Sequence, residues 1–332
     1  MAEVKISGAV DYSFIKTETA EITTNTMGGD TNQFNNLMFS ASEDLGNGIT
    51  ASAAIDLGIG YDYPPEGGGA SYTRSSHVGL SGEFGDFKIG RQLPPIFLAA
   101  TIDPVGLPAL SVGQEGLNTI FLIGGARNVR YNGSASYTSP VISGFKLNYF
   151  TAQANSQAVA TVGSTTGYGI AYAAGPVSLE YQTQKTDNEG IASYHQDAIA
   201  GGNAAGYEAG GDQTSRAMFA AKYEAGFATL AYIRGTTSHA LVGTTTNYVA
   251  IGVPISGTNF KISAGVNRST VDAKEDDDFD AAVNGSIFKV NYAFSKRTNA
   301  YFIYGNDETN NVDGADTSRK TTTTSFGLSH SF

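Results

Sequence analysis

Few side chains in this sequence have both the type and the spacing that catalysis requires. The four histidines, His77, His195, His239 and His330, are spread along the chain. A histidine that activates a serine needs a carboxylate to orient it, and no Ser–His–carboxylate cluster falls on one face of an alternating stretch. We therefore expect exposed or interfacial histidines and no catalytic residues.

An acidic run, DAKEDDDFD at 272–280, is a weak candidate for a metal site. Asp276, Asp278 and Asp280 alternate there, but the run lacks the glycine and the closing glutamate of a calcium-binding loop. A solvated acidic loop is the favoured interpretation, and a loop that binds a divalent cation such as calcium is the alternative. The glycine-rich GYGIAYAAG at 167–175 is not followed by a helix, as a nucleotide-binding loop would be. We expect no other cofactor.

Composition narrows the class of protein further. The chain has 332 residues, of which 41% are hydrophobic, with 41 glycines, 18 tyrosines, 18 phenylalanines and no cysteine. The net charge of −11 argues against nucleic acid as a partner, because phosphate binding needs a basic face. No apolar run approaches the roughly 18 residues that a membrane-spanning helix requires. Without cysteine, disulfides and thiolate metal sites are excluded.

Apolar and polar residues alternate along almost the whole chain, which is the period of a β-strand. In the first stretch the residues on one face are Val4, Ile6, Gly8, Val10, Tyr12 and Phe14. Similar stretches predict fifteen further strands, at 34–44, 48–60, 72–82, 86–92, 127–138, 144–154, 165–173, 176–185, 214–224, 226–235, 244–254, 258–269, 284–294, 297–307 and 320–332. No amphipathic helix longer than a few turns is expected.

The connections between these strands are alternately short and long. The short ones include LGNG at 45–48, and the long ones include 17–33 and 236–243. A sandwich of two sheets gives no reason for this alternation, whereas a transmembrane β-barrel has short turns at one end and long loops at the other. Tyrosines near the strand ends suit the membrane interfaces. We therefore predict a single domain, residues 1–332, that forms a 16-stranded antiparallel transmembrane β-barrel.

The two ends of the chain fit this prediction. The sequence closes on SFGLSHSF, in which Phe326, Leu328 and Phe332 share one face. A last strand that pairs with the first closes the ring and leaves no exposed edge. The chain opens on MAEVKISG without a signal peptide, and we interpret Met1 as a start codon placed before a mature sequence.

Five stretches resemble the trimeric general porins of Gram-negative bacteria, in their beta-proteobacterial, neisserial-type branch. They are VKISGAVD at 4–11, EDLGNG at 43–48, RSSHVGLSGEFGDFKIGRQ at 74–92, YAFSKRTNAYFIYG at 292–305 and FGLSHSF at 326–332. The resemblance implies a homotrimer of barrels in the outer membrane that act as passive channels. It also implies that the outer-membrane assembly machinery reads the closing strand, for which Phe326, Leu328 and Phe332 are the candidate signal.

The resemblance further implies that the third long loop folds into the lumen and narrows the pore. The residues agree with this, because the loop at about 93–126 is far longer than an ordinary connection. Its segments PPIFLAATIDPVGLPAL and NTIFLIGG are strongly apolar. Such a segment has to pack against something, and the inner wall of the barrel is the nearest surface.

Charged residues on both sides of the pore are the predicted constriction, since rings of charge are how pores discriminate ions. The candidates are Arg91, Arg130, Lys88, Lys146, Asp103, Glu115 and Asp11. Lys88 and Lys146 face inward by alternation. Strict alternation turns Arg91 outward, but a bulge at Gly90 and the resemblance both favour an inward position.

The chain departs from anion-preferring relatives in its inner charges. The resemblance implies that Asn36, Ser40 and Ser329 stand where those relatives carry cations. Arg74 has the outward parity of its strand. Acidic residues are instead assigned to the long loops, namely Glu18, Glu21, Asp30, Asp187, Glu189, Asp272, Glu275, Asp276, Asp277, Asp278, Asp307 and Asp313. We expect weak selectivity that shifts toward cations as the salt concentration falls.

The sequence therefore predicts an outer-membrane general diffusion porin for ions and small hydrophilic solutes. The alternative is a substrate-specific outer-membrane channel for a small organic solute, because the constriction loop is unusually apolar. An outer-membrane barrel hydrolase and a soluble all-β adhesin are weaker alternatives. The expected partners are two further copies of the chain, the lipid bilayer, lipopolysaccharide and the outer-membrane assembly machinery. Divalent cations that bridge the acidic loops to lipopolysaccharide phosphates are a further alternative.

Overall fold

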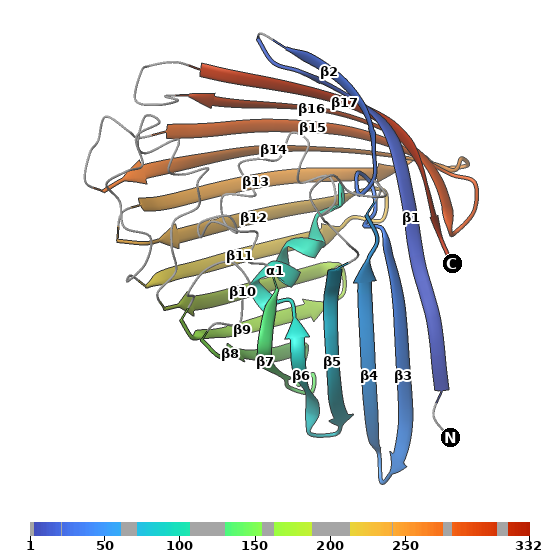
Figure 1. Ribbon diagram of the computed structural model, residues 1–332, viewed down its shortest axis with the longest axis vertical. Coiled ribbons are helices and arrows are strands. Elements are labelled where there is room, and N and C mark those ends of the chain that lie inside the picture. The colour runs from blue at the N-terminus through green and yellow to red at the C-terminus, as the bar shows by residue number, and fades with distance from the viewer. Residues whose placement is uncertain are drawn as a thin grey trace.

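Antiparallel strands make up most of the molecule and form one closed ring (Figure 1). The computed structural model describes residues 3–20, 22–60, 72–106, 130–154, 163–187, 213–240, 242–274, 281–310 and 318–332. The predicted 16-stranded barrel is confirmed, since sixteen strands form the wall. One additional short strand, β2, pairs with the second half of β1.

The first ten strands are β1 Glu3–Glu18, β2 Thr23–Gly28, β3 Asn36–Gly46, β4 Ile49–Gly58, β5 Tyr72–Gly82, β6 Gly85–Gln92, β7 Tyr131–Thr138, β8 Phe145–Ala152, β9 Thr165–Ala174 and β10 Val177–Thr186. The others are β11 Thr214–Glu224, β12 Thr229–Ser238, β13 Val242–Pro254, β14 Phe260–Ala273, β15 Ala281–Ala293, β16 Thr298–Asn310 and β17 Ser318–Ser331. Two short helical segments, α1 Pro95–Ala99 and η1 Ala100–Ile102, follow β6. Within the described residues, no helix is long and apolar enough to cross a membrane.

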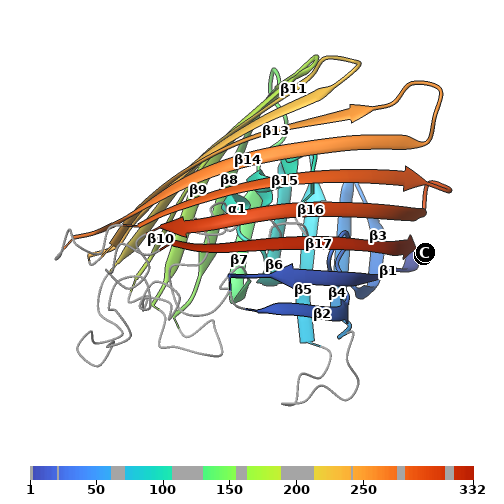
Figure 2. The same cartoon turned by 90° about the horizontal axis from the view of Figure 1, so that it is seen from above.

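The ring closes between the first and the last strand. On one edge, β1 pairs with β17, from Ala9 opposite Ser331 to Glu18 opposite Thr322. On its other edge, β1 pairs with β3 through residues 3–9 and with β2 through residues 13–18. Figure 2 shows β1 beside β17 at this seam. Each of the sixteen wall strands therefore has a partner on both edges, as a membrane barrel requires.

The structure differs from the sequence prediction on the side of the long connections. The strand β2 lies within the predicted loop 17–33. Between β12 and β13 there are three residues, 239–241, where a loop of 236–243 is expected. The stretch TTSHALVG at 236–243 lacks apolar alternation, but threonine is β-branched and favours extended backbone, so β12 extends to Ser238 and β13 begins at Val242.

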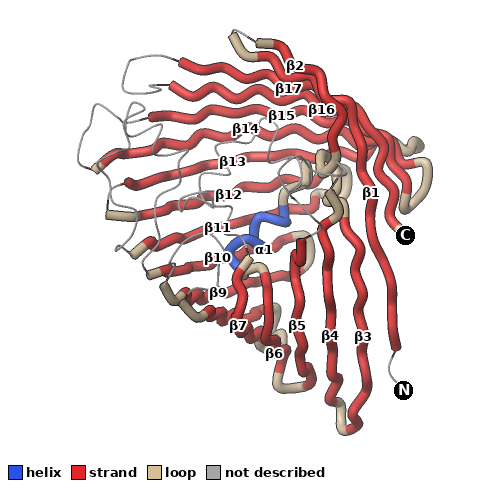
Figure 3. The backbone as a smooth tube through the Cα atoms, in the orientation of Figure 1, coloured by secondary structure: helices blue, strands red, loops and turns tan. Residues whose placement is uncertain are grey.

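The two faces of the wall meet different surroundings. Outward side chains such as Val78 and Phe326 are exposed, whereas Met218, Ile233 and Ile303 on the opposite face are buried in one cluster with residues of α1. This places α1 inside the ring, and Figure 3 shows the helix enclosed by strands. The strand register then tells which side chains of every neighbouring strand face the lumen.

Candidate functional site in the barrel lumen

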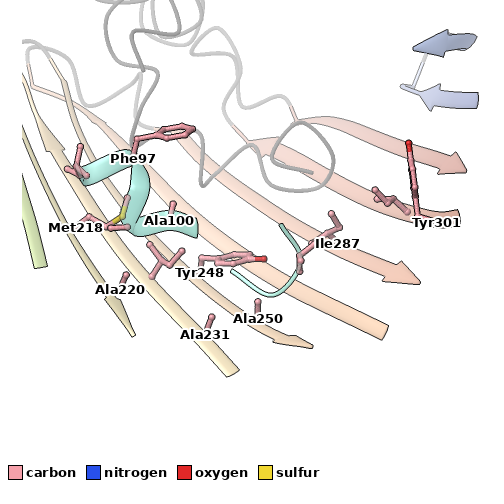
Figure 4. Packing of buried hydrophobic residues seen from close by; sticks show 14 residues of the cluster. Phe97, Ala100, Met218, Ala220, Ala231, Tyr248, Ala250, Ile287 and Tyr301 are labelled. Carbon is pink, nitrogen blue, oxygen red and sulfur yellow. The ribbon is translucent and has the colours of Figure 1, made fainter. Parts of the chain in front are cut away.

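The third loop turns into the lumen directly after β6. Proline at the first position of α1 favours a helix start there, because its missing N–H needs no partner. Ile96, Phe97 and Ala100 are buried, and burying a side chain such as isoleucine contributes about 1.5–3 kcal/mol. Figure 4 shows Met218 and Tyr248 on the wall beside the segment that carries Ala100.

This packing bears on the prediction that the third loop folds inward. The prediction is confirmed for residues 93–106, which the structure describes. The remainder of the predicted constriction loop, 107–126, lies outside the described residues.

Two lysines and a tyrosine of the wall bind the turn that follows the helical segments. Lys289 Nζ of β15 donates to Val105 O at 2.7 Å, and Lys261 Nζ of β14 donates to Pro104 O at 2.8 Å. The Tyr248 hydroxyl of β13 donates to Asp103 Oδ1 at 3.0 Å. We call these contacts the loop latch, formed by Asp103, Pro104, Val105, Tyr248, Lys261 and Lys289.

Further contacts tighten the latch. Asp103 Oδ1 also accepts from Val105 N at 3.0 Å. Gly252 of β13 leaves room for Pro104, because a Cβ at this glycine would lie 2.8 Å from the Pro104 Cβ. A hydrogen bond from a charged donor contributes about 1.5–3 kcal/mol, so the two lysine bonds oppose any displacement of the turn from the wall.

A second segment, residues 29–35, also lies against the inner wall. Asp11 Oδ2 accepts from the backbone N–H of Thr31 at 2.7 Å and of Asn32 at 2.8 Å. The Asn32 side chain donates to Ser329 Oγ at 2.9 Å. Asp11 is fully buried. It lies on the lumen face as expected, but its carboxylate anchors this segment instead of facing open water.

Charges of both signs gather beside this segment. Arg74 Nε lies 3.2 Å from Asp56 Oδ2, and its guanidinium lies 4.3 Å from the centroid of the Phe34 ring. Asp30 is within electrostatic range of Arg74 and Arg130. Burial raises the pKa of Asp30, and a backbone hydrogen bond and these two cations partly oppose that rise. We call Asp30, Asp56, Arg74 and Arg130 the mixed-charge cluster. The strand β5, which carries Arg74, lies about half of the ring away from β14, which carries Lys261 of the latch.

Lys88 and Lys146 lie on the lumen face near the short turns of the wall. Lys88 Nζ forms an ion pair with Asp86 Oδ2 at 2.6 Å. Lys146 shares a row with Glu180, and Ala171 stands between them. Both lysines are thus lumen charges with an acidic neighbour, and the structure does not bring them to the latch.

The structure corrects the inward position expected for Arg91. Arg91 lies opposite Ser76, which has the outward parity of β5. Its guanidinium donates to Thr73 O at 2.8 Å and to Asn132 Oδ1 at 2.7 Å, near the long-loop end of the wall. Gly90 has a φ of +141°, but the register irregularity adds its extra residue to β7 and not to β6. Alternation through β6 is therefore kept, and Arg91 stays on the outward parity.

For Arg74 the error of the prediction runs the other way. Its parity in the sequence predicts a side chain outside the pore, whereas the structure places it in the lumen. Asp56 pairs with Ser75 and Leu57 pairs with Thr73, so Arg74 is an extra residue in β5. A bulge of this kind re-aims a side chain. The Arg74 side chain is 8% exposed and contacts the lumen-facing Asp56, so Arg74 is a lumen arginine.

Some candidates lie outside the described residues. These are Glu115 of the third loop and the weak metal candidates Asp276, Asp278 and Asp280. Among the residues that the structure describes, no group of three histidines or carboxylates could hold a metal ion.

Some of the acidic residues assigned to the mouth lie elsewhere. Asp307 is buried on the lumen face of β16, and Asp30 belongs to the inner segment. Glu18 lies within β1 and pairs with Lys16 at 2.8 Å. Asp187 does lie in a long connection, where hydrogen bonds from Gln213 and Ser164 lower its pKa. The described part of the mouth therefore carries fewer acidic residues than the sequence predicts, and the lumen carries more acidic residues than the sequence predicts.

Sequence reasoning missed the wall residues of the latch. Lys289 lies between the outward residues Phe288 and Val290, so alternation alone turns it inward. The same argument applies to Lys261 of β14. No pattern in the sequence indicates which loop carbonyl an inward lysine will meet.

Comparison with known proteins agrees with this geometry. The profile of a family described as Gram-negative porin matches residues 1–312. The chain belongs to the family of Gram-negative porins. The porin is thus an outer-membrane β-barrel, and the resemblance seen in the sequence is confirmed.

Individual relatives of the porin come from several bacteria. The outer membrane porin protein 32 of Delftia acidovorans is 30% identical over 175 residues, which cover 48% of this chain and 47% of that protein. The alignment therefore spans about half of the relative's length. The structure is similar to an anion-selective porin from Comamonas acidovorans, with a TM-score of 0.80, 21% identity and 100% of both chains covered. It is also similar to OmpF of Salmonella typhi, with a TM-score of 0.72, 14% identity and coverage of 99% and 97%.

Proposed function

We propose that this porin is a general diffusion channel for ions and small hydrophilic solutes, with weak charge selectivity. The observation that carries the proposal is the loop latch, which holds α1 and the turn at 103–105 inside a strand-lined lumen. A fixed segment inside the lumen limits the size of the solutes that pass. Passive diffusion needs no moving part and no bound ligand.

The apolar sequence of the third loop does not favour a substrate-specific channel. Ile96 and Phe97 are buried at 3% and 7% exposure, whereas Leu98 is 46% exposed. Most of the apolar side chains of α1 are therefore used in packing. A solute that passes the described part of the loop meets few apolar groups that could select it.

Weak selectivity is proposed because described lumen charges stand close to opposite charges. Arg74 contacts Asp56, and the ammonium of Lys289 lies within electrostatic range of Asp11 and Asp103. We place the constriction between the latch and the mixed-charge cluster, which includes Arg130. Lys88 and Lys146 are lumen charges nearer the short turns, Glu115 remains a candidate, and Arg91 is left out.

We propose a homotrimer as the assembled form. OmpT of Vibrio cholerae, which is similar in fold with a TM-score of 0.71 and 13% identity and with coverage of 100% and 99%, has been solved in a trimer form. In this porin the outer face of β3 and β4 has a groove of about 410 Å³ lined by Ala41, Ala51 and Ala53 and flanked by Val78 and Leu80. Side chains of a neighbouring protomer would fill such a groove.

Lipopolysaccharide and the outer-membrane assembly machinery are the further partners proposed. Phe326, Leu328 and Phe332 are 59%, 56% and 46% exposed, so the closing strand offers them to a receptor during assembly. A divalent cation such as calcium at the acidic loop 272–280 stays a prediction.

Liposome swelling tests the proposed function. Purified porin is reconstituted into vesicles, and the entry of uncharged sugars of increasing size is followed by light scattering. We expect entry rates that fall smoothly with solute size and do not saturate. Saturation, or one solute that enters much faster than others of its size, would support a substrate-specific channel instead.

A further inference from the structure

The outer face of β12 and β14 carries two arginines where a lipid-facing wall is expected to be apolar. Arg234 of β12 pairs with Phe219, which is 37% exposed on the outer face. Arg268 of β14 shares the parity of Val266, which is 58% exposed on the same face. Asn247 of β13 lies directly between the two arginines. Neighbouring strands are about 4.8 Å apart, so the two arginines stand roughly 10 Å apart in one row.

The hydrogen-bond partners of Arg234 in this row are neutral, so they do not cancel the positive charge of the row. Arg234 Nη1 donates to Asn247 Oδ1 at 2.9 Å, and the Tyr232 hydroxyl donates to the same oxygen at 3.0 Å. Among the described residues, no carboxylate forms an ion pair with either arginine. The outward carboxylate Glu308 lies two strands beyond Arg268. A cation on the lipid face is unfavourable, so the row is suited to an anionic partner from outside the chain.

Next to this row, toward the long-loop end, the outer face has a groove of about 500 Å³ that crosses β9 to β12. Its outward lining includes Thr183, Lys185, Ser215, Thr236 and Ser238. Hydroxyl groups and one ammonium thus line the groove. The outward residues of β11 in the groove, Ser215 and Ala217, are small and leave this space open.

The groove and the arginine row lie at the edge of the outward aromatic residues. Tyr181, Phe219 and Arg234 form one row across β10, β11 and β12, and Lys185 follows Tyr181 by four residues on β10. Aromatic rings mark the interface between lipid tails and headgroups. The three cations therefore lie at the level of the headgroups, on the side of the long external loops.

We propose that Lys185, Arg234, Arg268 and the hydroxyl-lined groove bind the phosphorylated sugar headgroup of an outer-leaflet glycolipid. Arginine binds phosphate oxygens through paired N–H donors, hydroxyls match a sugar, and the exposed Phe219 contacts the acyl chains. Asp187 is a nearby carboxylate that competes for Lys185, but it accepts hydrogen bonds from Ser164 and Gln213, both at 2.8 Å. The proposal rests on the outer-membrane location of the porin and identifies a site for its lipopolysaccharide partner.

Native mass spectrometry of the refolded porin in detergent tests the glycolipid site. The probes are lipid A with two phosphates and phosphatidylglycerol, each titrated separately. We expect tighter binding of lipid A. The double variant Arg234→Gln/Arg268→Gln is expected to bind it about 25-fold more weakly, since each cation near a membrane surface contributes roughly fivefold. Lys222→Gln, which removes a lumen-facing cation of β11, is the matched control and keeps its affinity.

A second variant tests the groove without a change of charge. Ser215→Phe fills the groove and is expected to weaken lipid A binding. Equal affinity of the wild type and the double variant, or equal affinity of the wild type for lipid A and phosphatidylglycerol, contradicts the proposal. Conductance in a planar bilayer tests the channel function separately from lipid A binding. The double variant is expected to conduct like the wild type. A wild type that binds lipid A but passes no current contradicts the proposed function and leaves the glycolipid site standing.

Discussion

The ring of Phe332 covers Gly8 at the seam where the barrel closes. A Cβ on Gly8 would lie 2.6 Å from Cζ of Phe332 and 2.5 Å from the backbone oxygen of Asn36. Gly8 N–H donates to Phe332 O at 3.2 Å, and Phe332 N–H donates to Gly8 O at 3.0 Å. The terminal residue is thus paired and packed against the first strand.

Deletion of Phe332 is expected to lower the amount of porin in the outer membrane while most of the protein still refolds in detergent. The loss of two backbone hydrogen bonds costs about 1–3 kcal/mol, which the many remaining strand pairs tolerate. In the proposed assembly route, the deletion also removes the terminal aromatic residue of the candidate signal. Surface labelling and detergent refolding are measured in parallel, and equal surface levels of both forms would refute the prediction.

Gly8→Ala is the comparison for this deletion, because it keeps Phe332 but removes the space beneath its ring. We expect a loss of about 1–3 kcal/mol in stability, as for other overpacked sites, with a smaller effect on insertion than the deletion has. Thermal unfolding in detergent, followed by circular dichroism, measures the first effect.

The double variant Lys261→Met/Lys289→Met is expected to loosen the loop latch. The carbonyls of Pro104 and Val105 lose charged donors worth about 1.5–3 kcal/mol each, so the turn leaves its position more often. Single-channel recordings should show more current noise at the same salt. Lys146→Met, which removes a lumen cation away from the turn, is the control. Equal noise in both variants would mean that the lysines do not hold the loop.

Asp30 is expected to give the channel a pH-dependent ion preference. Its pKa is raised by burial, so on acidification it takes up a proton above the range of an ordinary aspartate. The lumen then loses a negative charge, and preference shifts toward anions. This protonation favours the folded state, because the buried group is disfavoured when it is ionised. Asp30→Asn should remove this upper part of the titration of the reversal potential, and an unchanged titration curve would contradict the assignment.

How much of the fold could be predicted is clear from individual strands. A wall between lipid and water forces alternation, so the wall strands and their short turns follow from the sequence. Thr236, Thr237 and Ser238 carry hydroxyls on both faces of β12, so no alternation marks them as strand, and the sequence predicts a loop there. Alternation placed Arg91 correctly on its own, but failed for Arg74, because one extra residue in β5 reverses the parity.

The candidate site was less predictable because its contacts join distant parts of the chain. Asp103 was found because it belongs to a long apolar loop. Tyr248 and Lys289 were not found, since their partners depend on the path of that loop through the lumen. The segment 29–35 reads as an ordinary polar loop, and its inward position depends on Asp11, about twenty residues earlier.

Ion preference is expected to be weak at high salt and to shift toward cations as the salt concentration falls. Asn36 donates to Asp56 Oδ1 at 2.7 Å and Ser329 accepts from Asn32, so these two neutral residues support anchoring contacts and add no positive charge to the lumen. The net charge of −11 is screened beyond about 8 Å at physiological salt but acts over about 30 Å at 0.01 M. Reversal potentials under potassium chloride gradients measure this shift. Strong anion preference that persists at low salt would show that Arg74 and Arg130 outweigh the acidic groups.

The central claim is that the third loop lies inside the lumen and sets the size of the pore. Single-channel conductance of a variant that lacks most of residues 93–126, measured in a planar bilayer beside the wild type, tests this claim most directly. The account predicts a higher conductance in the variant, with an intact barrel that still runs as a folded species on a gel. An unchanged conductance would contradict the account, because it would mean that the loop does not obstruct the path of the ions.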